Sequence, residues 1–276
     1  MKLIEKILVG KRKDPALCED GIFFNGDFAA VVDGCSSHKG ALYEGKSSGV
    51  IAKDTILGAL TMLPPQSTME EAFLACNRAL EGWYEEHHLL GVMGEDPSMR
   101  CCAYAAIVSR ARREVWILGD CQALVDGQLY TSEKPIDTLM ENLRALYIEV
   151  ELQKGRTEAQ VAQSMEPIQA KLAQQMALQS LFQNTLVRTS FSYHVLDGFF
   201  TNVGAVQVVK LEGPAKDVAL GTDGYPHLHA SLHASEESLA SLLEGDPLCF
   251  RENRATKGVM EGNISFDDRA YLRIIV

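Results

Sequence analysis

The sequence predicts an α+β fold in which antiparallel sheets are faced by helical pairs. Strand patterns occur in groups joined by short turns, and helical patterns occur in pairs between these groups. Strands that gather in hairpins, without alternating singly with helices, favour antiparallel sheets over a doubly wound parallel sheet. No repeat, low-complexity tract or Pro/Ser-rich linker divides the 276 residues. We therefore expect a single domain spanning residues 1–276.

The strand predictions come from short apolar runs bounded by turn residues. The clearest is the segment 21–32, in which Asn25-Gly26 separates two apolar runs and predicts a hairpin. Asp126-Gly127 predicts a second hairpin turn within residues 122–130. The remaining strand patterns lie at 102–108, 114–118, 205–211, 217–221 and 270–276.

The helix predictions come from apolar periodicity and from capping residues. Residues 48–63 are apolar enough for a largely buried helix. Thr68, with Glu71 three residues later, has the spacing of a capping box and predicts the start of a second helix. Helical spacing then dominates the region at about 133–190, which we interpret as a helical insert or flap beside the strands.

Composition narrows the class of partner and the cellular compartment. The chain carries 26 basic and 37 acidic residues, a net charge of −11. Nucleic acids and anionic membranes attract basic surfaces, so we expect neither as a partner. No apolar run approaches the length that spans a bilayer. The seven cysteines lack C-x-x-C spacing and indicate reduced thiols, so we expect a cytoplasmic protein.

One short motif suggests nucleotide binding. Residues 40–47 match the P-loop pattern, with Gly40, four residues, and then Gly45-Lys46-Ser47. A P-loop must leave a strand directly, whereas here the preceding strand pattern ends near Val32 and a polar segment intervenes. A small-residue start to the buried helix explains the same letters. A P-loop nucleotide-binding protein is kept as a less favoured alternative.

Acidic residues lie where several strand patterns meet turns. Asp-Gly is a favoured turn dipeptide, so each of these sites taken alone indicates a turn. As an ordered set they indicate a hard-metal site, because Mg²⁺ and Mn²⁺ prefer carboxylate, carbonyl and water oxygens. The set, in chain order, is Glu19-Asp20, Asp33-Gly34, Gly119-Asp120, Asp223-Gly224 and Asp267-Asp268.

This series resembles the successive motifs of the metal-dependent protein phosphatases, the type 2C serine/threonine family, and especially its bacterial members. The matching segments are CED (18–20), AAVVDGCSS (29–37), VWILGDCQALV (115–125), VALGTDGY (218–225) and FDDRAYLRII (266–275). The resemblance extends over nearly the whole chain. It implies a four-layer αββα sandwich and a metal-dependent phosphomonoester hydrolase that acts on a phosphorylated protein or another phosphomonoester.

The resemblance also implies ligands for two Mn²⁺ or Mg²⁺ ions, which together would activate a water for attack on phosphorus. Asp33 would bridge both ions, and the carbonyl of Gly34 would bind one of them. Asp223 and Asp268 would hold the other ion. The same oxygen ligands serve both metals, so the sequence does not distinguish Mn²⁺ from Mg²⁺.

Supporting roles follow from the same comparison. Glu19 and Asp20 would orient metal-bound waters, and Asp120 would correspond to a weaker ligand of a third ion. The second aspartate of that third site is replaced by His227 in this chain.

The substrate-binding half departs from the family pattern. Family members usually carry a phosphate-clamping arginine four residues before the glutamate of the E-D motif, and that position is Pro15 here. Arg12 and Lys13 are the nearby cations. This departure supports an alternative interpretation, a catalytically weak or inactive phosphatase-like binding or regulatory module.

Overall fold

A computed structural model describes residues 1–12, 14–37, 39–132 and 134–276. It contains two five-stranded sheets in which every neighbouring pair of strands is antiparallel. Sheet A has the order β1 (Lys2–Val9), β12 (Arg269–Ile275), β11 (Asp217–Gly221), β8 (Gln122–Val125) and β9 (Gln128–Tyr130). Sheet B has the order β10 (Gln207–Lys210), β7 (Glu114–Leu118), β6 (Cys102–Ser109), β3 (Phe28–Cys35) and β2 (Asp20–Phe24).

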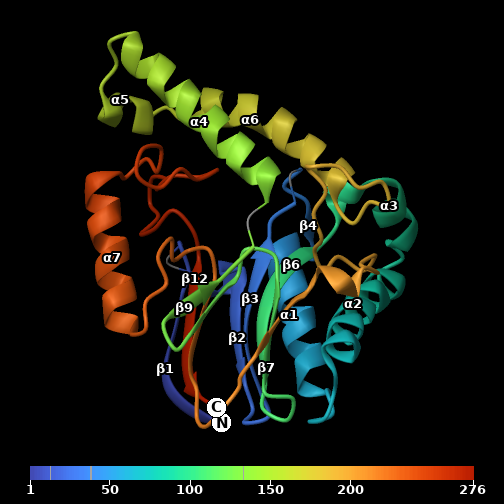
Figure 1. The fold of residues 1–276 in the computed structure, drawn as a ribbon. Helices are drawn as coiled ribbons and strands as arrows, with labels where there is room; N and C mark the ends of the chain where they lie inside the picture. Colours follow the sequence, from blue (N-terminus) through green and yellow to red (C-terminus); the bar gives the residue numbers. More distant parts are fainter. Residues whose placement is uncertain (13, 38, 133) are drawn as a thin grey trace.

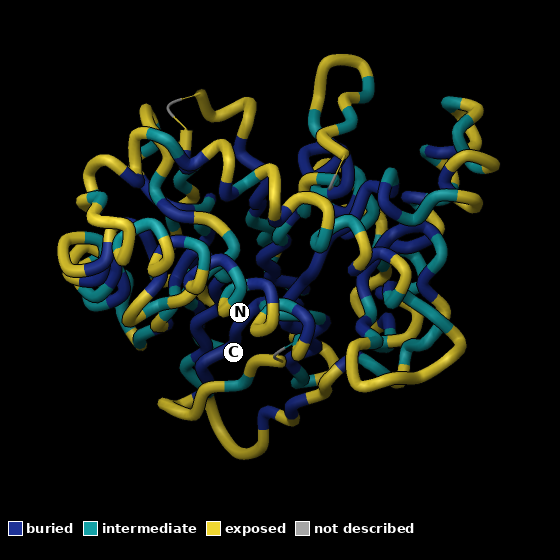
Figure 2. The backbone as a smooth tube through the Cα atoms, turned by 90° about the horizontal axis from the view of Figure 1, so that it is seen from above, coloured by how far each residue is buried: buried dark blue, intermediate teal, exposed yellow. Residues whose placement is uncertain are grey.

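The two sheets pack face to face between helical layers (Figure 1). The core between the sheets includes Val31 and Ile117 from sheet B and Leu220 and Leu272 from sheet A, all at most 1% exposed. Figure 2, seen from above, shows buried chain concentrated in this middle and exposed chain at the periphery. The predicted α+β sandwich of antiparallel sheets is confirmed.

Helices cover the outer face of each sheet. On sheet B, α1 (Ser48–Thr61) and α2 (Met69–Glu86) bury Ile56 and Phe73 against Trp116. On sheet A, α7 (Leu232–Gly245) and the segment 246–266 pack around Leu239 and Tyr271. The remaining short helices are α3 (Leu90–Glu95), η1 (Pro15–Leu17), η2 (Pro97–Met99), η3 (Ser180–Phe182) and η4 (Val203–Ala205).

A helical arm projects over one end of the sandwich (Figure 1). It consists of α4 (Pro135–Gln153), α5 (Glu158–Ala162) and α6 (Glu166–Gln179). These helices have a small apolar core of their own, in which Ile148, Val161 and Leu172 pack against Leu248 and Phe250. We call this unit the roof. It corresponds to the helices expected at about 133–190, and residue 133 itself lies outside the described residues.

Most local predictions match the structure. The Asn25-Gly26 turn joins β2 to β3, and the Thr68–Glu71 capping box begins α2. The strand β1 has no counterpart among the predictions. Its residues alternate in exposure, but the apolar side chains of Ile4 and Leu8 lie on the exposed side, so the sequence lacks the apolar–polar alternation by which a strand is recognised.

The segment with the P-loop pattern adopts a different structure from a phosphate-binding loop. β4 (Leu42–Tyr43) and β5 (Lys46–Ser47) pair within it as a short hairpin. Ser47 then caps α1, accepting a hydrogen bond from the backbone N–H of Val50, and the Lys46 ammonium pairs with Asp54 on the surface. The letters are thus explained by the start of a buried helix.

Candidate metal centre

The strand alternation of β3 directs Asp33 into the space between the two sheets. Ala29 and Val31 belong to the core between the sheets, and Asp33 continues the same row by two residues. At this point the sandwich is no longer filled by apolar side chains. A carboxylate therefore lies at the mouth of the core, held by a strand that is hydrogen-bonded on both sides.

Gly34 brings the E-D segment against β3. Its backbone N–H donates to the Glu19 carbonyl over 3.0 Å. A Cβ at this position would lie 2.2 Å from the Gly49 carbonyl oxygen and 2.7 Å from that of Glu19. Only glycine fits between these backbones. The consequence is that Glu19 and Asp20 are positioned directly beside Asp33, and Asp20 is the strand partner of Asp33.

Glu19 and Asp20 are buried and already hydrogen-bonded. Glu19 is 5% exposed and accepts hydrogen bonds from the hydroxyls of Ser36 and Ser47, each at 2.6 Å. Asp20 accepts from the Thr222 hydroxyl at 2.5 Å. These contacts lock both carboxylates at the rim of the site. Because their oxygens are already hydrogen-bonded, Glu19 and Asp20 are better placed to position neighbouring groups than to bind a ligand directly.

A third chain segment arrives from β11. Asp223 follows this strand, and Gly224 lies so close to the terminal segment that a Cβ would come within 1.9 Å of the Asp268 carbonyl oxygen. This contact fixes Asp223 next to the residues before β12. Asp223 and Asp33 line the same cavity.

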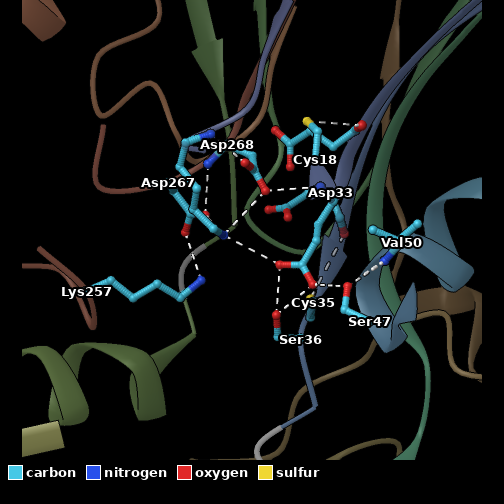
Figure 3. Close-up of polar contacts among 12 residues, drawn as sticks. Cys18, Asp33, Cys35, Ser36, Ser47, Val50, Lys257, Asp267 and Asp268 are labelled. Atoms are coloured by element: carbon cyan, nitrogen blue, oxygen red, sulfur yellow. Dashed lines mark hydrogen bonds and ion pairs between the residues drawn. The ribbon is translucent and has the colours of Figure 1, made fainter. Parts of the chain in front are cut away.

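The structure separates the two neighbouring aspartates of the last motif (Figure 3). Asp268 is 1% exposed, and its carboxylate accepts hydrogen bonds from the backbone N–H groups of Lys11 and Glu19 at 2.6 and 3.0 Å. Asp267, in contrast, lines the cavity together with Asp33 and Asp223. The sequence motifs predict Asp268 as the metal ligand. In the structure, Asp267 is the aspartate that lines the cavity, whereas Asp268 joins the segments of Lys11 and Glu19 through hydrogen bonds.

Two lysines, absent from the sequence predictions, are paired with this acidic cluster. The Lys11 ammonium lies 2.7 Å from Asp267, 3.3 Å from Asp268 and 3.5 Å from Glu19. The Lys257 ammonium lies 3.0 Å from Asp267. Burial acts to raise the pKa of Asp267, but Lys257 and Lys11 outweigh it and lower the pKa to about 2.

The other carboxylates of the cluster have the opposite shift. Burial raises the pKa of Asp33 well above its ordinary value, and the charges of Asp20 and Asp120 raise it further. Burial likewise raises the pKa of Asp223, with Asp33 and Asp267 adding to the effect. Within the described ranges, no protein group donates a hydrogen bond to either side chain. Asp33 and Asp223 are crowded by other carboxylates and receive no hydrogen bonds from the described part of the chain. A bound cation would stabilise the charged form of both side chains.

Asp120 has an ammonium group for a neighbour. It follows Gly119, which has a φ of 78°. The Lys134 ammonium lies 3.4 Å from the Asp120 carboxylate, 2.6 Å from that of Asp137 and 2.8 Å from the Tyr104 hydroxyl. The other oxygen of Asp120 is buried without a hydrogen-bond partner. Positive charge at this carboxylate is thus already supplied by a side chain.

A cavity of about 820 Å³ connects these groups. Its lining contains seven basic and six acidic residues among those described, although acidic residues outnumber basic ones in the whole chain. Arg12 and Lys257 are among the basic residues that line it. Pro15 lies in the exposed helix η1, and Lys13, the other cation expected near a phosphate, lies outside the described residues.

The side chains and carbonyls around the cavity decide whether Mn²⁺ or Mg²⁺ can bind there. In the described part of the chain, no three histidine, cysteine, aspartate or glutamate side chains converge as a ready-made metal cluster. The available donors are nevertheless carboxylates and a backbone carbonyl, which are the oxygen ligands that hard divalent cations prefer. The side chains of Asp33 and Asp223, which receive no hydrogen bond from the described residues, fit such ions, whereas Asp120 is already paired with Lys134.

No protein-family model matches the chain, and no curated protein matches it in sequence. Its structure is similar to the Mycobacterium tuberculosis serine/threonine phosphatase PstP/Ppp, with 16% identity, a TM-score of 0.48 and coverage of 99% of this chain and 98% of that one. It is also similar to serine/threonine phosphatase Stp1 from Staphylococcus aureus, with 12% identity, a TM-score of 0.47 and coverage of 100% and 95%. Similarity at this level assigns no activity to the chain.

Proposed function

We propose that the protein is a metal-dependent phosphomonoester hydrolase that acts on phosphoserine or phosphothreonine in proteins, or on another phosphomonoester. The observation that supports the proposal is that Asp33, Asp223 and Asp267, from three segments far apart in sequence, line one cavity. The mixture of acidic and basic side chains around that cavity supports it. An anionic substrate can bind there once metal ions offset the carboxylates.

Asp33, the Gly34 carbonyl, Asp223 and Asp267 would hold two Mn²⁺ or Mg²⁺ ions. When bound, the ions would supply Lewis acidity, lowering the pKa of a water and offsetting negative charge on the phosphoryl group. Asp267 must exchange its lysine partners for this task. We propose that Glu19 and Asp20 position waters, as their locked conformations allow, and that Asp120 keeps Lys134 as its cation.

The phosphate side of the site requires a cation in place of the arginine missing at Pro15. We propose that Lys257 and Arg12 fill this role, since both line the cavity. The Lys257→Met variant should raise KM for an aryl phosphate about tenfold, because a hydrogen bond to a charged group contributes roughly 1.5–3 kcal/mol. Arg12→Met should raise KM as well, without disturbing the Lys257–Asp267 pair. Unchanged KM in both variants would exclude these two residues as the phosphate-binding cations.

The decisive test is hydrolysis of 4-nitrophenyl phosphate with Mn²⁺, compared with the same assay in chelator. Activity should depend on metal and should fall by more than ~100-fold in Asp33→Ala and Asp223→Ala, because each loses a ligand worth several kcal/mol. Asp126→Asn, a surface Asp-Gly site, is the matched control and should retain full activity. Unchanged hydrolysis in both alanine variants would refute the mechanism. Absence of both Mn²⁺ binding by calorimetry and hydrolysis would instead favour the non-catalytic module.

Two features bear on where the protein works. All seven cysteines are free thiols, and six of them are buried. No helix in the described ranges is long and apolar enough to cross a membrane. The free thiols support a cytoplasmic site of action, which we include in the proposal.

A further inference from the structure

The cavity above the carboxylates extends beneath the roof. Asp33, Asp120 and Asp223 form its floor, whereas Leu172, Met176 and Gln179 of α6 line it from the roof. Its volume of about 820 Å³ lies within the range of roughly 300–1,000 Å³ that is typical of small-molecule sites. The phosphate of a bound ester would occupy the floor, so the space under the roof remains for the alcohol portion of the substrate.

Gln179, the last residue of α6, lines this space and carries an unsatisfied polar group. Its side chain is only 4% exposed, and it makes no hydrogen bond with any described residue. The carboxamide nitrogen Nε2 is buried without a partner. Leaving such a donor unpaired costs about 1–3 kcal/mol. A ligand acceptor in the cavity would remove this cost when the carboxamide turns its Nε2 toward the cavity that the residue lines.

The nearby Gln183 shows what a structural glutamine looks like in the same region. Its Nε2 donates to Asp197 at 2.8 Å and to the Cys102 sulfur at 3.2 Å, and its Oε1 accepts from the Tyr193 hydroxyl at 3.1 Å. Every polar atom of the Gln183 side chain is therefore used by the fold. Gln179 has no comparable structural use.

Gln183 also ties this end of the roof to the floor. Its contact residue Cys102 is the strand partner of Cys35, which directly follows Asp33-Gly34. The segment that follows α6 is therefore anchored to β6, the strand paired with the one that carries the proposed bridging carboxylate. A group held by Gln179 would lie between that anchor and the carboxylate floor, within the one cavity that both line.

We propose that Gln179 determines substrate specificity by donating a hydrogen bond from Nε2 to an acceptor on the alcohol portion of the phosphomonoester. This inference rests on the proposed function. The substrate class is a phosphomonoester with a carbonyl, nitro or similar oxygen on its alcohol portion. Leu172 and Met176 supply apolar contacts to the same portion. An acceptor of this kind is present both in a phosphoserine peptide, as a peptide carbonyl, and in a small organic phosphate.

The test compares esters with and without an acceptor. Values of kcat/KM are measured for benzyl phosphate, for its 2-, 3- and 4-nitro derivatives and for N-acetyl phosphoserine methylamide, with the wild-type chain and with Gln179→Leu. We expect a loss of roughly 3- to 10-fold for at least one acceptor-bearing ester and less than twofold for benzyl phosphate. Selective loss with a nitro ester identifies a small-molecule acceptor, and selective loss with the phosphoserine compound alone identifies a peptide carbonyl.

Gln174→Leu is the matched control. Gln174 lies on the exposed side of the same helix and does not line the cavity, so its substitution should leave all five kcat/KM values unchanged. An equal loss on every ester in Gln179→Leu, or no loss on any of them, would overturn the proposal. Thermal unfolding of both variants verifies that the roof is intact.

A binding measurement separates this inference from the proposed function. Saturation-transfer NMR with the metal-free protein measures binding of benzyl alcohol and its three nitro derivatives. Weaker binding of a nitro alcohol in Gln179→Leu, with benzyl alcohol unchanged, supports the Gln179 contact even if no ester is hydrolysed. Equal binding in both proteins argues against the contact, even if the wild-type chain proves to be an active hydrolase.

Discussion

Two of the five Asp-Gly pairs in the chain look alike in sequence and differ completely in structure. Asp126-Gly127 forms the turn between β8 and β9, with φ values of 47° and 87°, and its glycine has open space around it. Asp33-Gly34 continues the extended strand β3, and its glycine is enclosed by the backbones of Glu19 and Gly49. One pair needs glycine for its backbone conformation, and the other needs it for a close approach. The close approach is what assembles the candidate site.

The largest difference should appear in stability when each glycine becomes alanine. Gly34→Ala places a Cβ 2.2 Å from the Gly49 carbonyl oxygen, a clash with backbone that cannot rotate away. We expect a loss of about 3 kcal/mol or more in the free energy of unfolding, at the upper end of overpacking costs. Urea unfolding measures it. A loss smaller than that of Gly127→Ala would contradict the close approach of the Gly34 and Gly49 backbones.

The second comparison concerns metal. At a free Mn²⁺ concentration 100-fold above the dissociation constant, binding to the folded state stabilises the wild-type chain by about 2.7 kcal/mol, a rise in Tm of roughly 5–10 °C. Asp33→Asn should lose most of this rise, whereas Asp126→Asn should keep it, as measured by thermal unfolding. An undiminished rise in Asp33→Asn would show that the ion binds elsewhere.

The two aspartates should also have opposite effects on the pH dependence of stability. The folded-state pKa of Asp33 is raised above the ordinary 3.8, so the native state retains a proton that the unfolded chain releases. The contribution of Asp33 to the free energy of unfolding therefore falls as pH rises from 3.8 through the raised pKa. The pKa of Asp126 is lowered by its hydrogen bond with Lys216, so its contribution is lost only as pH falls below 3.8.

Urea midpoints of the metal-free protein, measured from roughly pH 4 to 8, test this sign. The wild-type chain should lose stability toward high pH, and Asp33→Asn should flatten that loss and be the more stable protein at the alkaline end. Asp126→Asn should follow the wild-type curve over this range. A wild-type midpoint that rises with pH would mean that other groups dominate.

The smallest expected effect belongs to the turn. Gly127→Ala forces an alanine to a φ near 87°, which costs about 1–2 kcal/mol, and no atom lies within 4 Å of the new Cβ. Activity and metal affinity should remain at wild-type values, because the turn lies outside the cavity. A loss of metal affinity in this variant would contradict the independence of the Asp126-Gly127 turn and the candidate metal site.

Local sequence patterns predicted the sandwich and part of the cavity. The hairpin at 21–32, the capping box at Thr68 and the Asp-Gly turn at 126–127 are set by neighbouring residues, and the structure confirms all three. Asp33 and Asp223 were predicted from motifs at strand ends, and both line the cavity. Their role as ligands remains a prediction.

The missed features depend on contacts between distant segments. Lys11 meets Asp267 across 256 positions of sequence, and no local pattern marks such a pair. Whether Asp267 or Asp268 is free to bind a ligand likewise depends on distant residues, because the backbone N–H groups of Lys11 and Glu19 donate hydrogen bonds to the carboxylate of Asp268. Gln179 carries no motif at all. Gln175 also has a buried oxygen without a partner, but of these two residues it is Gln179 that lines the cavity, and the sequence marks neither of them.

The roof has its own apolar core, separate from the core between the sheets. Such a satellite core makes α4–α6 a candidate for a cooperative unit that can open while the sandwich stays folded. Its amide hydrogens should then exchange with solvent at a common opening free energy, smaller than that of the strands in sheet B. An ester too large to enter between roof and floor could still reach the carboxylates during these openings. Its turnover rate would then be limited by how often this unit unfolds.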